Sequence, residues 1–323
     1  MTDAMTERSK VSLITTVKDA AEEIGPFLAS LAAQTRVPDE VIVVDGGSSD
    51  GTVERLRAAH DLTLIESPGA NISRGRNVAI GAATHDVLAL TDADCVLEAD
   101  WLERLLEPLE RGADVSMGFY RPISETFFQA CMAAVNLPNA DEVDPNRFMP
   151  SGRSVAFTRA AIDAAGGYPE WLDIGEDMYV DLAWRRLGLE MGFAPDAVVN
   201  WRLRPTLRET WIQYFRYARG DAIAGMYPDR HALRFGVYSA GLYAWSTRGA
   251  LRKVAALAGL GAYVAGPMRR AATRFEDPMT RARALAAVPA LMAFVDAAKM
   301  AGWLAGTAER GRGTAERGPV DPV

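Results

Sequence analysis

The sequence predicts an α/β fold in which helices cover both faces of a mostly parallel sheet, followed by an Ala-rich helical extension. Short apolar runs rich in β-branched residues recur over the first 112 residues, and a segment with helical spacing follows each one. Continuous apolar runs are typical of strands buried on both faces of a parallel sheet. From residue 235 the chain is instead rich in Ala, Gly and Leu, with Arg interleaved, which predicts the extension.

The expected elements follow in chain order. The apolar runs predict strands at residues 11–17, 41–45, 62–67 and 86–90. Helical spacing predicts helices within residues 22–35, 46–60, 73–83 and 98–112, and we expect Asp50 or Ser49 to cap the second of these. Beyond residue 112 the pattern loosens into a short strand, a helix, a Gly-rich loop and a further helix, and an aromatic and basic helix follows within residues 205–225.

These patterns predict three regions. We expect an α/β domain that carries the functional site at residues 1–225, a basic helical extension at 226–306 and a disordered, low-complexity tail at 307–323. The net charge of −7 is unevenly spread, because residues 1–200 carry −17 and residues 201–323 carry +10. The basic region could therefore face an anionic membrane surface or an anionic ligand.

The scarce residue types exclude several classes of protein. Two cysteines, Cys95 and Cys131, cannot form a disulfide framework or a multi-cysteine zinc site, and they suit a reducing compartment. Three histidines without i, i+4 pairing make a histidine metal site improbable. The polar N-terminus lacks the apolar core of a signal peptide, so we expect a cytoplasmic protein.

Residues 284–306 are long enough to span a bilayer, although Asp296 and Lys299 would then lie inside the membrane at considerable cost. Residues 254–268 are apolar, flanked by Arg and Lys, and too short to span. Three arrangements of the extension stay open: it spans a membrane, lies in the interface or packs as a soluble part of the protein. We favour helices that pack on the domain or lie in the interface.

Acidic residues end two of the predicted strands: Asp45 ends one, and Asp92 and Asp94 follow another. In open α/β sheets, ligands bind outside the carboxyl ends of the strands, so these acids should converge on one site. If Asp92 and Asp94 are extended, their carboxylates point to the same side about 6.5 Å apart and can share a divalent ion. An acidic surface turn is the alternative.

Four segments in order resemble the family-2 nucleotide-sugar glycosyltransferases of the GT-A fold. They are "VSLITTVKDAAEEIGPFLASLAAQT", "VIVVDGGSSDGT", "SRGRNVAIGAATHDVLALTDADCVLEADWLERLL" and "GGYPEWLDIGEDMYVDLAWRRLG". The resemblance covers residues 10–225. It implies a nucleotide-sugar half at about 10–112 and an acceptor half at about 113–225.

The resemblance implies a role for each acid at the donor site. Asp45 resembles the residue that hydrogen-bonds the nucleotide base, although Gly46 stands where the family often has a second acid. Asp92 resembles the residue near the ribose and the metal, and Asp94 the direct ligand of a divalent cation, Mn²⁺ or Mg²⁺. Arg74 and Arg76 could neutralise the diphosphate, or could simply be exposed helix charges.

The second half carries the expected catalytic residues. The family places the general base at the Asp of the Glu176–Asp177 pair, so Asp177 is the expected base and Glu176 the alternative. Asp177 could also cap a helix. Gln213–Gly220 resembles the family's Gln-x-x-Arg-Trp element with Tyr217 in place of Trp, and its Arg216 could reach phosphate or could belong to an ordinary amphipathic helix. Ser151–Phe157 resembles the strand before the acceptor loop.

The expected function is therefore a metal-dependent, inverting and non-processive sugar transfer to a saccharide, a lipid-linked acceptor or another hydroxyl acceptor. We expect no nucleic-acid partner. A catalytically silent, membrane-associated nucleotide-binding subunit is the main alternative. A nucleotidyltransferase is disfavoured because the segment after the first strand is acidic, and a dinucleotide dehydrogenase because no G-x-G-x-x-G follows that strand.

Overall fold

The computed structural model describes residues 9–312, and the contacts within it divide the chain into two compact units. The first unit comprises the chain to Arg121 together with Val143–Arg202. The second comprises Pro122–Glu142 together with the chain from Leu203. The helix at residues 207–224 therefore packs with the helical extension, whereas the expected boundary lay after residue 225.

The first unit is built on an eight-stranded mixed sheet with the order β3-β2-β1-β4-β7-β6-β8-β5. The strands are β1 (Val11–Val17), β2 (Glu40–Asp45), β3 (Thr63–Glu66), β4 (Val87–Leu90), β5 (Cys95–Leu97), β6 (Val115–Ile123), β7 (Val155–Thr158) and β8 (Met191–Arg202). The pairs β3–β2, β2–β1 and β1–β4 are parallel, whereas β4–β7, β7–β6 and β8–β5 are antiparallel. The parallel part coincides with the four strands expected from the sequence.

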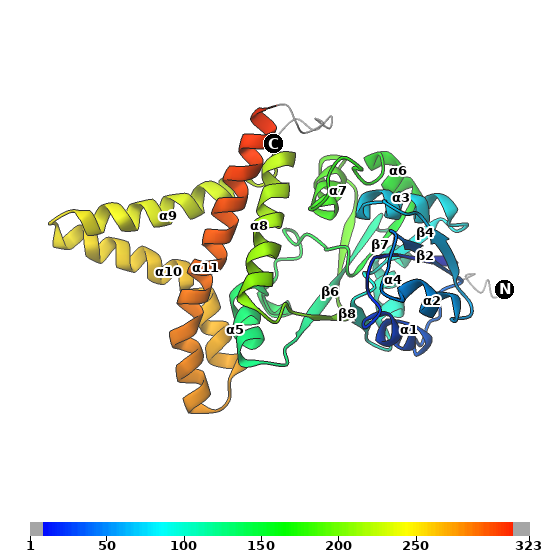
Figure 1. The fold of residues 1–323 in the computed structure, drawn as a ribbon, viewed down its shortest axis with the longest axis horizontal. Helices are drawn as coiled ribbons and strands as arrows, with labels where there is room; N and C mark the ends of the chain where they lie inside the picture. Colours follow the sequence, from blue (N-terminus) through cyan, green and yellow to red (C-terminus); the bar gives the residue numbers. More distant parts are fainter. Residues whose placement is uncertain (1–8, 313–323) are drawn as a thin grey trace, which may run out of the picture. The chain divides into compact units, whose positions relative to one another are not determined.

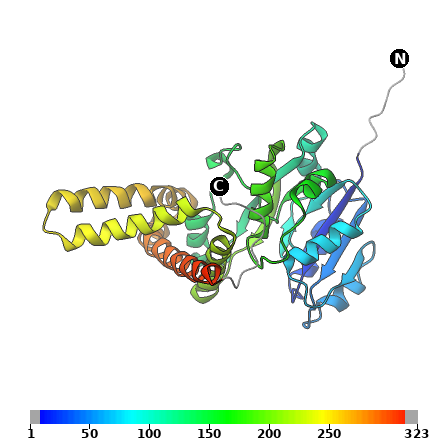
Figure 2. The same ribbon diagram turned by 90° about the horizontal axis from the view of Figure 1, so that it is seen from above.

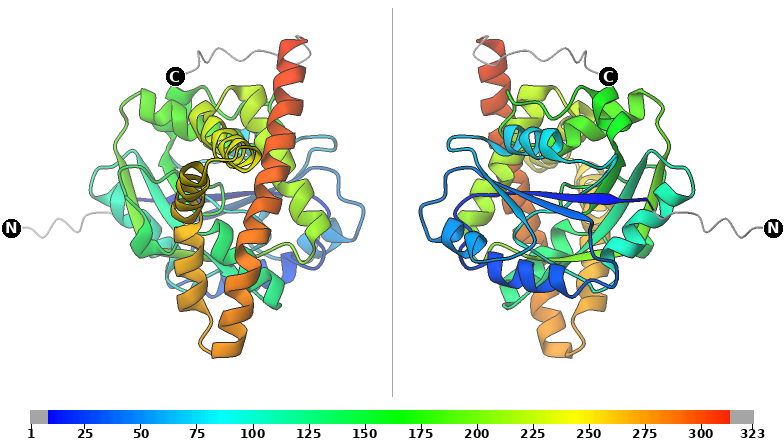
Figure 3. Two further views of the ribbon diagram at one scale, coloured as in Figure 1. Left: turned by 90° about the vertical axis from the view of Figure 1, so that its left-hand side faces the viewer. Right: turned by 90° about the vertical axis from the view of Figure 1, so that its right-hand side faces the viewer.

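Helices cover both faces of this sheet (Figure 3). The helices α1 (Ile24–Ala32) and α4 (Trp101–Glu110) lie on one face and are joined by the Gln34 side chain, which accepts a hydrogen bond from Leu102 N. The other face carries α3 (Ile72–Ala82), α6 (Arg159–Ala165) and α7 (Glu176–Arg186), with a core centred on Phe157 and Trp184. The predicted α/β fold with two-sided cover is confirmed.

Two predicted helix caps are wrong. The helix α2 (Thr52–Arg57) begins after Gly51, whose φ of 96° favours glycine, while the Asp50 carboxylate accepts the Thr52 N–H. Likewise α7 begins after Gly175, with φ 89°, so Asp177 lies in the first turn instead of capping the helix. In both places a glycine in the left-handed region turns the chain into the helix, which leaves the acidic side chain available for other partners.

The second unit is helical in its described part, apart from the end of β6 (Figure 1). Its helices are α5 (Phe127–Asn136), η1 (Ala140–Glu142), α8 (Leu207–Ala224), α9 (Pro228–Ser246), α10 (Ala250–Arg274) and α11 (Pro278–Gly311). The backbones of α8 and α11 approach closely, because a Cβ on Gly302 would lie 2.1 Å from Phe215 O and one on Gly306 would lie 2.4 Å from Arg219 O. Two glycines thus allow α11 to pack along α8.

The helices α9 and α10 form an antiparallel hairpin that extends from the α8–α11 pair (Figure 2). A short turn then joins α10 to α11 (Figure 3). By length and hydropathy, α11 is the one helix in residues 9–312 that could cross a membrane. It continues to Gly311, so the tail expected to be disordered from residue 307 is helical at its start; residues 313–323 lie outside the described part.

Candidate functional site

A tight turn at the end of β4 carries the two aspartates that the sequence singled out. The Asp92 carbonyl accepts a hydrogen bond from Cys95 N at 3.1 Å, so residues 92–95 form a turn and the spacing of an extended strand does not apply to Asp92 and Asp94. Both side chains are partly exposed, whereas Ala93 and Cys95 beside them are buried. Packing of the intervening apolar residues therefore fixes a turn that carries two accessible carboxylates.

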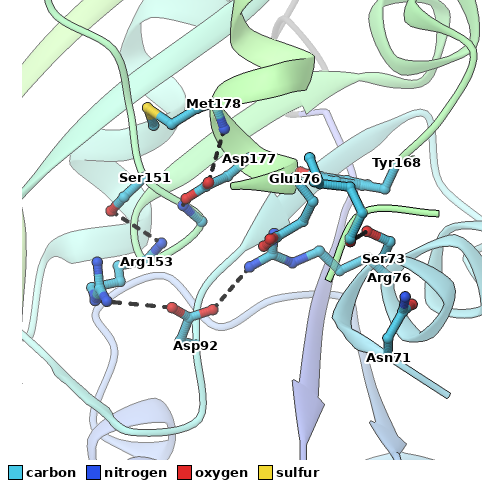
Figure 4. Close-up of polar contacts among 12 residues, drawn as sticks. Asn71, Ser73, Arg76, Asp92, Ser151, Arg153, Tyr168, Glu176, Asp177 and Met178 are labelled. Atoms are coloured by element: carbon cyan, nitrogen blue, oxygen red, sulfur yellow. Dashed lines mark hydrogen bonds and ion pairs between the residues drawn. The ribbon is translucent and has the colours of Figure 1, made fainter. Parts of the chain in front are cut away.

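Arg76 joins this turn to the start of α7 (Figure 4). Its guanidinium donates to Asp92 Oδ1 at 3.1 Å and to Glu176 Oε1 at 2.7 Å, and it lies 5.1 Å from the centre of the Tyr168 ring. The side chain is only 2% exposed. Although burial opposes its charge, the carboxylate of Glu176 chiefly, together with Tyr168 and Asp92, keeps the pKa of Arg76 above its ordinary value. A permanently charged arginine therefore links residues far apart in the sequence.

The Glu176–Asp177 pair begins α7 and divides into two environments. Glu176 is 5% exposed, and its burial raises its pKa to about 7, against the opposing effect of Arg76. Asp177 is partly exposed, and its Oδ2 accepts the Gly152 N–H at 3.1 Å while its Oδ1 accepts the Met178 N–H at 2.8 Å. Glu176 thus anchors the helix to Arg76, and Asp177 presents a carboxylate oriented by two backbone donors.

Asp181, one turn further along α7, is also buried at 3% exposure. Burial chiefly, and then the charge of Asp177, raise its pKa well above the ordinary value.

The loop before β7 approaches Arg76 so closely that position 152 has no room for a side chain, and a glycine stands there. A Cβ at this position would lie 2.2 Å from Arg76 Nη2, and the backbone N–H of the same residue holds Asp177. The next residue, Arg153, has its Nε 3.9 Å from Asp92 Oδ2 and its guanidinium 4.0 Å from the centre of the Trp201 ring. Asp92 therefore lies between two arginines, of which only Arg76 was predicted.

Three side chains of α3 hold the Gly-rich loop that precedes α7. Asn77 accepts the Tyr168 N–H at 2.8 Å and donates to the Tyr168 carbonyl at 2.9 Å. Ser73 donates to the Leu172 carbonyl, and Asn71 donates to the Glu170 carbonyl. Gly167, with φ +78° and a Cβ position 3.1 Å from Asn77 Oδ1, allows the close approach. The Arg-Asn dipeptide of α3 thus fixes two things at once: Arg76 holds α7, and Asn77 holds the loop that leads to it.

Asp45 ends β2 as predicted, but its carboxylate turns into its own loop. The residue is 2% exposed, and its Oδ2 accepts the N–H groups of Gly47 at 2.8 Å and Ser48 at 3.0 Å. The Ser48 hydroxyl donates to Oδ1. Asp45 therefore stabilises the turn at residues 46–48, a role that the sequence did not indicate.

The remaining two predicted residues, Arg74 and Arg216, have other surroundings within their own units. Arg74 lies exposed on α3, where its backbone N–H bonds the capping Asn71 side chain. Arg216 lies on α8 in the second unit, where it lines a hollow with Trp211, Ile212, Phe215 and Arg219. In the same element Gln213 donates to the Tyr217 hydroxyl at 3.0 Å. Among the predicted residues, the first unit thus joins Arg76, Asp92 and Glu176 by direct contacts, with Asp177 adjacent.

The donor atoms at the turn suit a hard divalent cation. The carboxylates of Asp92 and Asp94 offer oxygen ligands, which Mg²⁺ and Mn²⁺ prefer, and the buried thiol of Cys95 beside them has a pKa raised by burial. Within residues 9–312, no three acidic, His or Cys side chains gather closely enough to hold a metal by themselves. The residues present therefore fit an ion that takes part of its coordination from a bound ligand or water.

Comparisons with known proteins point to one family. Residues 12–146 match the model of "Glycosyl transferase family 2". The glycosyltransferase AglE of Haloferax volcanii is 30% identical over 241 residues, covering 69% of this chain and 76% of that protein. The succinoglycan biosynthesis protein ExoA of Rhizobium meliloti is 28% identical, covering 68% and 71% respectively. Since the relatives are named as glycosyltransferases or as biosynthetic proteins, a catalytically silent subunit is not favoured.

Solved structures share the fold at low sequence identity. A mannosyltransferase from Pyrobaculum calidifontis, in complex with GDP-Man and Mn²⁺, has a TM-score of 0.52 at 20% identity, covering 94% of this chain and 88% of that one. TarS from S. aureus has a TM-score of 0.50 at 18% identity, covering 94% and 92%. These similarities confirm the GT-A fold that the sequence motifs predicted.

Proposed function

The chain is a glycosyltransferase that belongs to glycosyl transferase family 2, and we propose that it moves a sugar from a nucleotide-sugar donor to an acceptor hydroxyl with inversion. The observation that carries the proposal is the Arg76 bridge between Asp92 and Glu176. This bridge brings the acidic turn, suited to a metal–diphosphate, next to a helix start that presents Asp177. A donor site and a proton acceptor are then parts of one connected cluster.

Asp177 is the proposed general base. A sugar hydroxyl is a poor nucleophile, so a carboxylate within hydrogen-bond reach must accept its proton during the attack. Two backbone N–H groups orient Asp177, whereas Glu176 is buried and engaged by Arg76. Asp177 is therefore the member of the pair that would accept the acceptor's proton, and the inverting outcome is what the resemblance to the family implies.

Asp94, with support from Asp92, is the proposed ligand set for Mn²⁺ or Mg²⁺. Such an ion, when bound, draws negative charge from the leaving diphosphate and orients it. Arg153 and Arg74 would supply positive charge to the diphosphate, because guanidinium matches phosphate oxygens. Arg76 is 2% exposed and bonded to Asp92 and Glu176, so it would act by holding those two carboxylates in place. The mannosyltransferase of the same fold was solved with GDP-Man and Mn²⁺, which supports testing both an ion and GDP-sugars here.

Four further proposals concern Asp45, Arg216, the acceptor and the location of the protein. Asp45 would receive the base of the nucleotide after its carboxylate exchanges contacts with Gly47 and Ser48 for a contact with the base. Arg216 would meet phosphate or sugar from the hollow on α8. The acceptor would be a saccharide, a lipid-linked acceptor or another hydroxyl compound, modified one residue at a time. The proposed location is the cytoplasm, peripherally at the inner face of the membrane.

The test is a panel of UDP-, GDP- and dTDP-sugars, followed by calorimetry and donor hydrolysis with Mn²⁺, with Mg²⁺ and with a chelator. We expect one donor class to bind only with a divalent ion, and Asp94→Asn to weaken that binding by tenfold or more. Asp196→Asn, at an exposed position on β8, is the matched control and should bind as the native protein does. Equal donor affinity with and without chelator would overturn the role of Asp94.

A further inference from the structure

The end of the α9–α10 hairpin exposes large apolar side chains that soluble proteins usually bury. Trp245 is 72% and Leu251 82% exposed, and Leu242, Tyr243, Val254 and Leu257 are each at least 59% exposed. None of residues 254–262 is buried. Contiguous apolar exposure of this kind marks an interaction surface. We call residues 242–260 the hairpin tip.

The charge around the hairpin tip has one sign. Residues 230–275 contain eight Lys or Arg residues and no Asp or Glu. Three of the cations lie at the turn of the hairpin, where Arg252 faces the Tyr243 ring at 5.8 Å and Lys253 the Trp245 ring at 5.3 Å. Apolar, aromatic and cationic side chains side by side match the interface of an anionic bilayer, where Trp and Tyr lie at headgroup depth.

The long apolar helix α11 makes its main polar and backbone contacts within the protein. Its glycines pack against the α8 backbone, and its Asp296 is 5% exposed, accepting hydrogen bonds from Arg234 and from the hydroxyls of Tyr238 and Tyr263. A carboxylate paired in this way belongs to the interior of a helical bundle. One face of the membrane candidate by hydropathy is thus occupied within the protein, although Met279 and Leu304 on it are exposed. The three most exposed large apolar side chains of the described residues, Leu251, Leu242 and Trp245, lie on the hairpin.

The length of the hairpin decides how it meets a bilayer. Its uncharged stretches cover residues 235–247 and 254–268, and a helix of this size reaches about 22 Å, less than the ~30 Å of a hydrocarbon core. Insertion by the turn would bury Arg248, Arg252 and Lys253 without reaching the far headgroups. If the hairpin lies flat instead, its apolar side chains enter the interface while the three cations extend to lipid phosphates.

We propose that the α9–α10 hairpin is a monotopic docking element that lies flat in the interface of an anionic membrane. This deepens the proposed peripheral location and does not depend on the sugar-transfer chemistry. A second copy of the chain fits the surface less well, because a symmetric contact through the hairpin would bring like charges together on both sides.

The test is flotation of the full chain with phosphatidylcholine vesicles, with and without about a third phosphatidylglycerol. We expect binding to the anionic vesicles that weakens as salt rises towards about 0.5 M. The variant carrying Trp245→Ser and Leu251→Ser should lose vesicle affinity by tenfold or more, because two anchoring side chains disappear. The variant carrying Arg252→Gln and Lys253→Gln should lose severalfold and become less sensitive to salt.

The matched control carries Met279→Ser and Leu304→Ser, two exposed apolar positions on α11 outside the hairpin, and should bind as the native chain does. Asp177→Asn should also bind vesicles normally, so failure of the catalytic proposal would not imitate failure of this one. Equal vesicle binding by the hairpin variant would overturn the inference. So would a native chain that ignores anionic vesicles but dimerises through Trp245 and Leu251.

Discussion

Each unit holds an arginine among several acceptors, Arg76 in the first and Arg234 in the second, and the two clusters differ in what surrounds these side chains. In the first unit, Arg76 bridges Asp92, whose side chain is 25% exposed, and Glu176, whose side chain is 7% exposed. In the second, Arg234 contacts Asp296 and the buried His231, and Asp296 also accepts from two tyrosines. His231 in turn bonds Asp221 and stacks on Trp303. At the centre of the second cluster the side chains of Asp296 and His231 are 5% and 4% exposed, and Asp221 at its edge is 22% exposed and bonded to His231.

This difference distinguishes the proposed functional cluster from one that we expect to be structural. A fully paired network stabilises a bundle and has no group left for a ligand. The cluster around Arg76 instead combines partly exposed acids with arginines that match phosphate, and it lies at the strand ends where α/β proteins bind ligands. Similar pairs of charges therefore have different expected consequences when they are broken.

The largest expected effect comes from replacing each arginine by Met. Either change leaves a buried carboxylate without its partner and should cost about 3–5 kcal/mol in the free energy of unfolding. Only Arg76→Met should also abolish donor binding, measured by calorimetry at a temperature where both variants are folded. If the Arg234→Met variant loses donor affinity as fully as the Arg76→Met variant does, the proposed distinction between the two clusters is wrong.

Replacing Lys299 in the second unit should change the free energy of unfolding by a smaller amount. Burial chiefly, and then Arg234, lower its pKa to about 8, while its ammonium lies 4.8 Å from the Tyr214 ring centre. The unfolded chain therefore holds this proton more tightly, and the cost to stability is full below pH 8 and fades towards pH 10.5. Lys299→Met should stabilise by about 1–3 kcal/mol at pH 7 and by little at pH 10.5.

Thermal unfolding at the two pH values checks this, with donor binding as the second measurement. We expect a higher Tm at pH 7 and unchanged donor affinity. A lower Tm at pH 7 would mean that the contact of Lys299 with Tyr214 outweighs its burial.

Gly152→Ala should have a smaller effect on stability and a specific one on the site. The new Cβ would push the Arg76 guanidinium away from Asp92, at a cost of about 1–3 kcal/mol. Gly81→Ala on α3 is the control, because nothing lies within 4 Å of its Cβ position and alanine favours a helix by about 1 kcal/mol. If donor binding weakens in Gly152→Ala and not in Gly81→Ala, the close approach of the loop to Arg76 is needed for donor binding. Equal donor affinity in both variants would argue against this.

The sequence predicts the parallel half of the sheet well, because continuous apolar runs such as residues 41–45 and 86–90 signal buried strands directly. Motifs in order also predict Arg76, Asp92, Asp94, Glu176 and Asp177 as site residues, and the structure joins Arg76 to Asp92 and Glu176 by direct contacts. The contacts between these residues could not be predicted, because Arg76 bonds one partner 16 residues away, Asp92, and another 100 residues away, Glu176. The division of roles between Arg74 and Arg76 depends on which face of α3 packs inward.

Gly152 and Arg153 were missed for a related reason. Only their local pattern, Ser151–Phe157, was recognised, and a glycine outside the positive-φ region gives no sequence signal for close approach. The sequence left the arrangement of the extension open. Hydropathy favours α11 as the membrane candidate, yet α11 packs on α8, while the shorter apolar stretches of α9 and α10 expose large apolar side chains. Hydropathy alone does not say which apolar helix finds partners within the protein.

The most direct test of the central claim is a comparison of donor binding and single-turnover transfer in Asp177→Asn. Asparagine preserves the shape of the side chain but cannot accept the acceptor's proton. We predict unchanged donor affinity and a transfer rate lowered by about 10²–10⁴-fold. A transfer rate close to that of the native protein would contradict the assignment of Asp177 as the base.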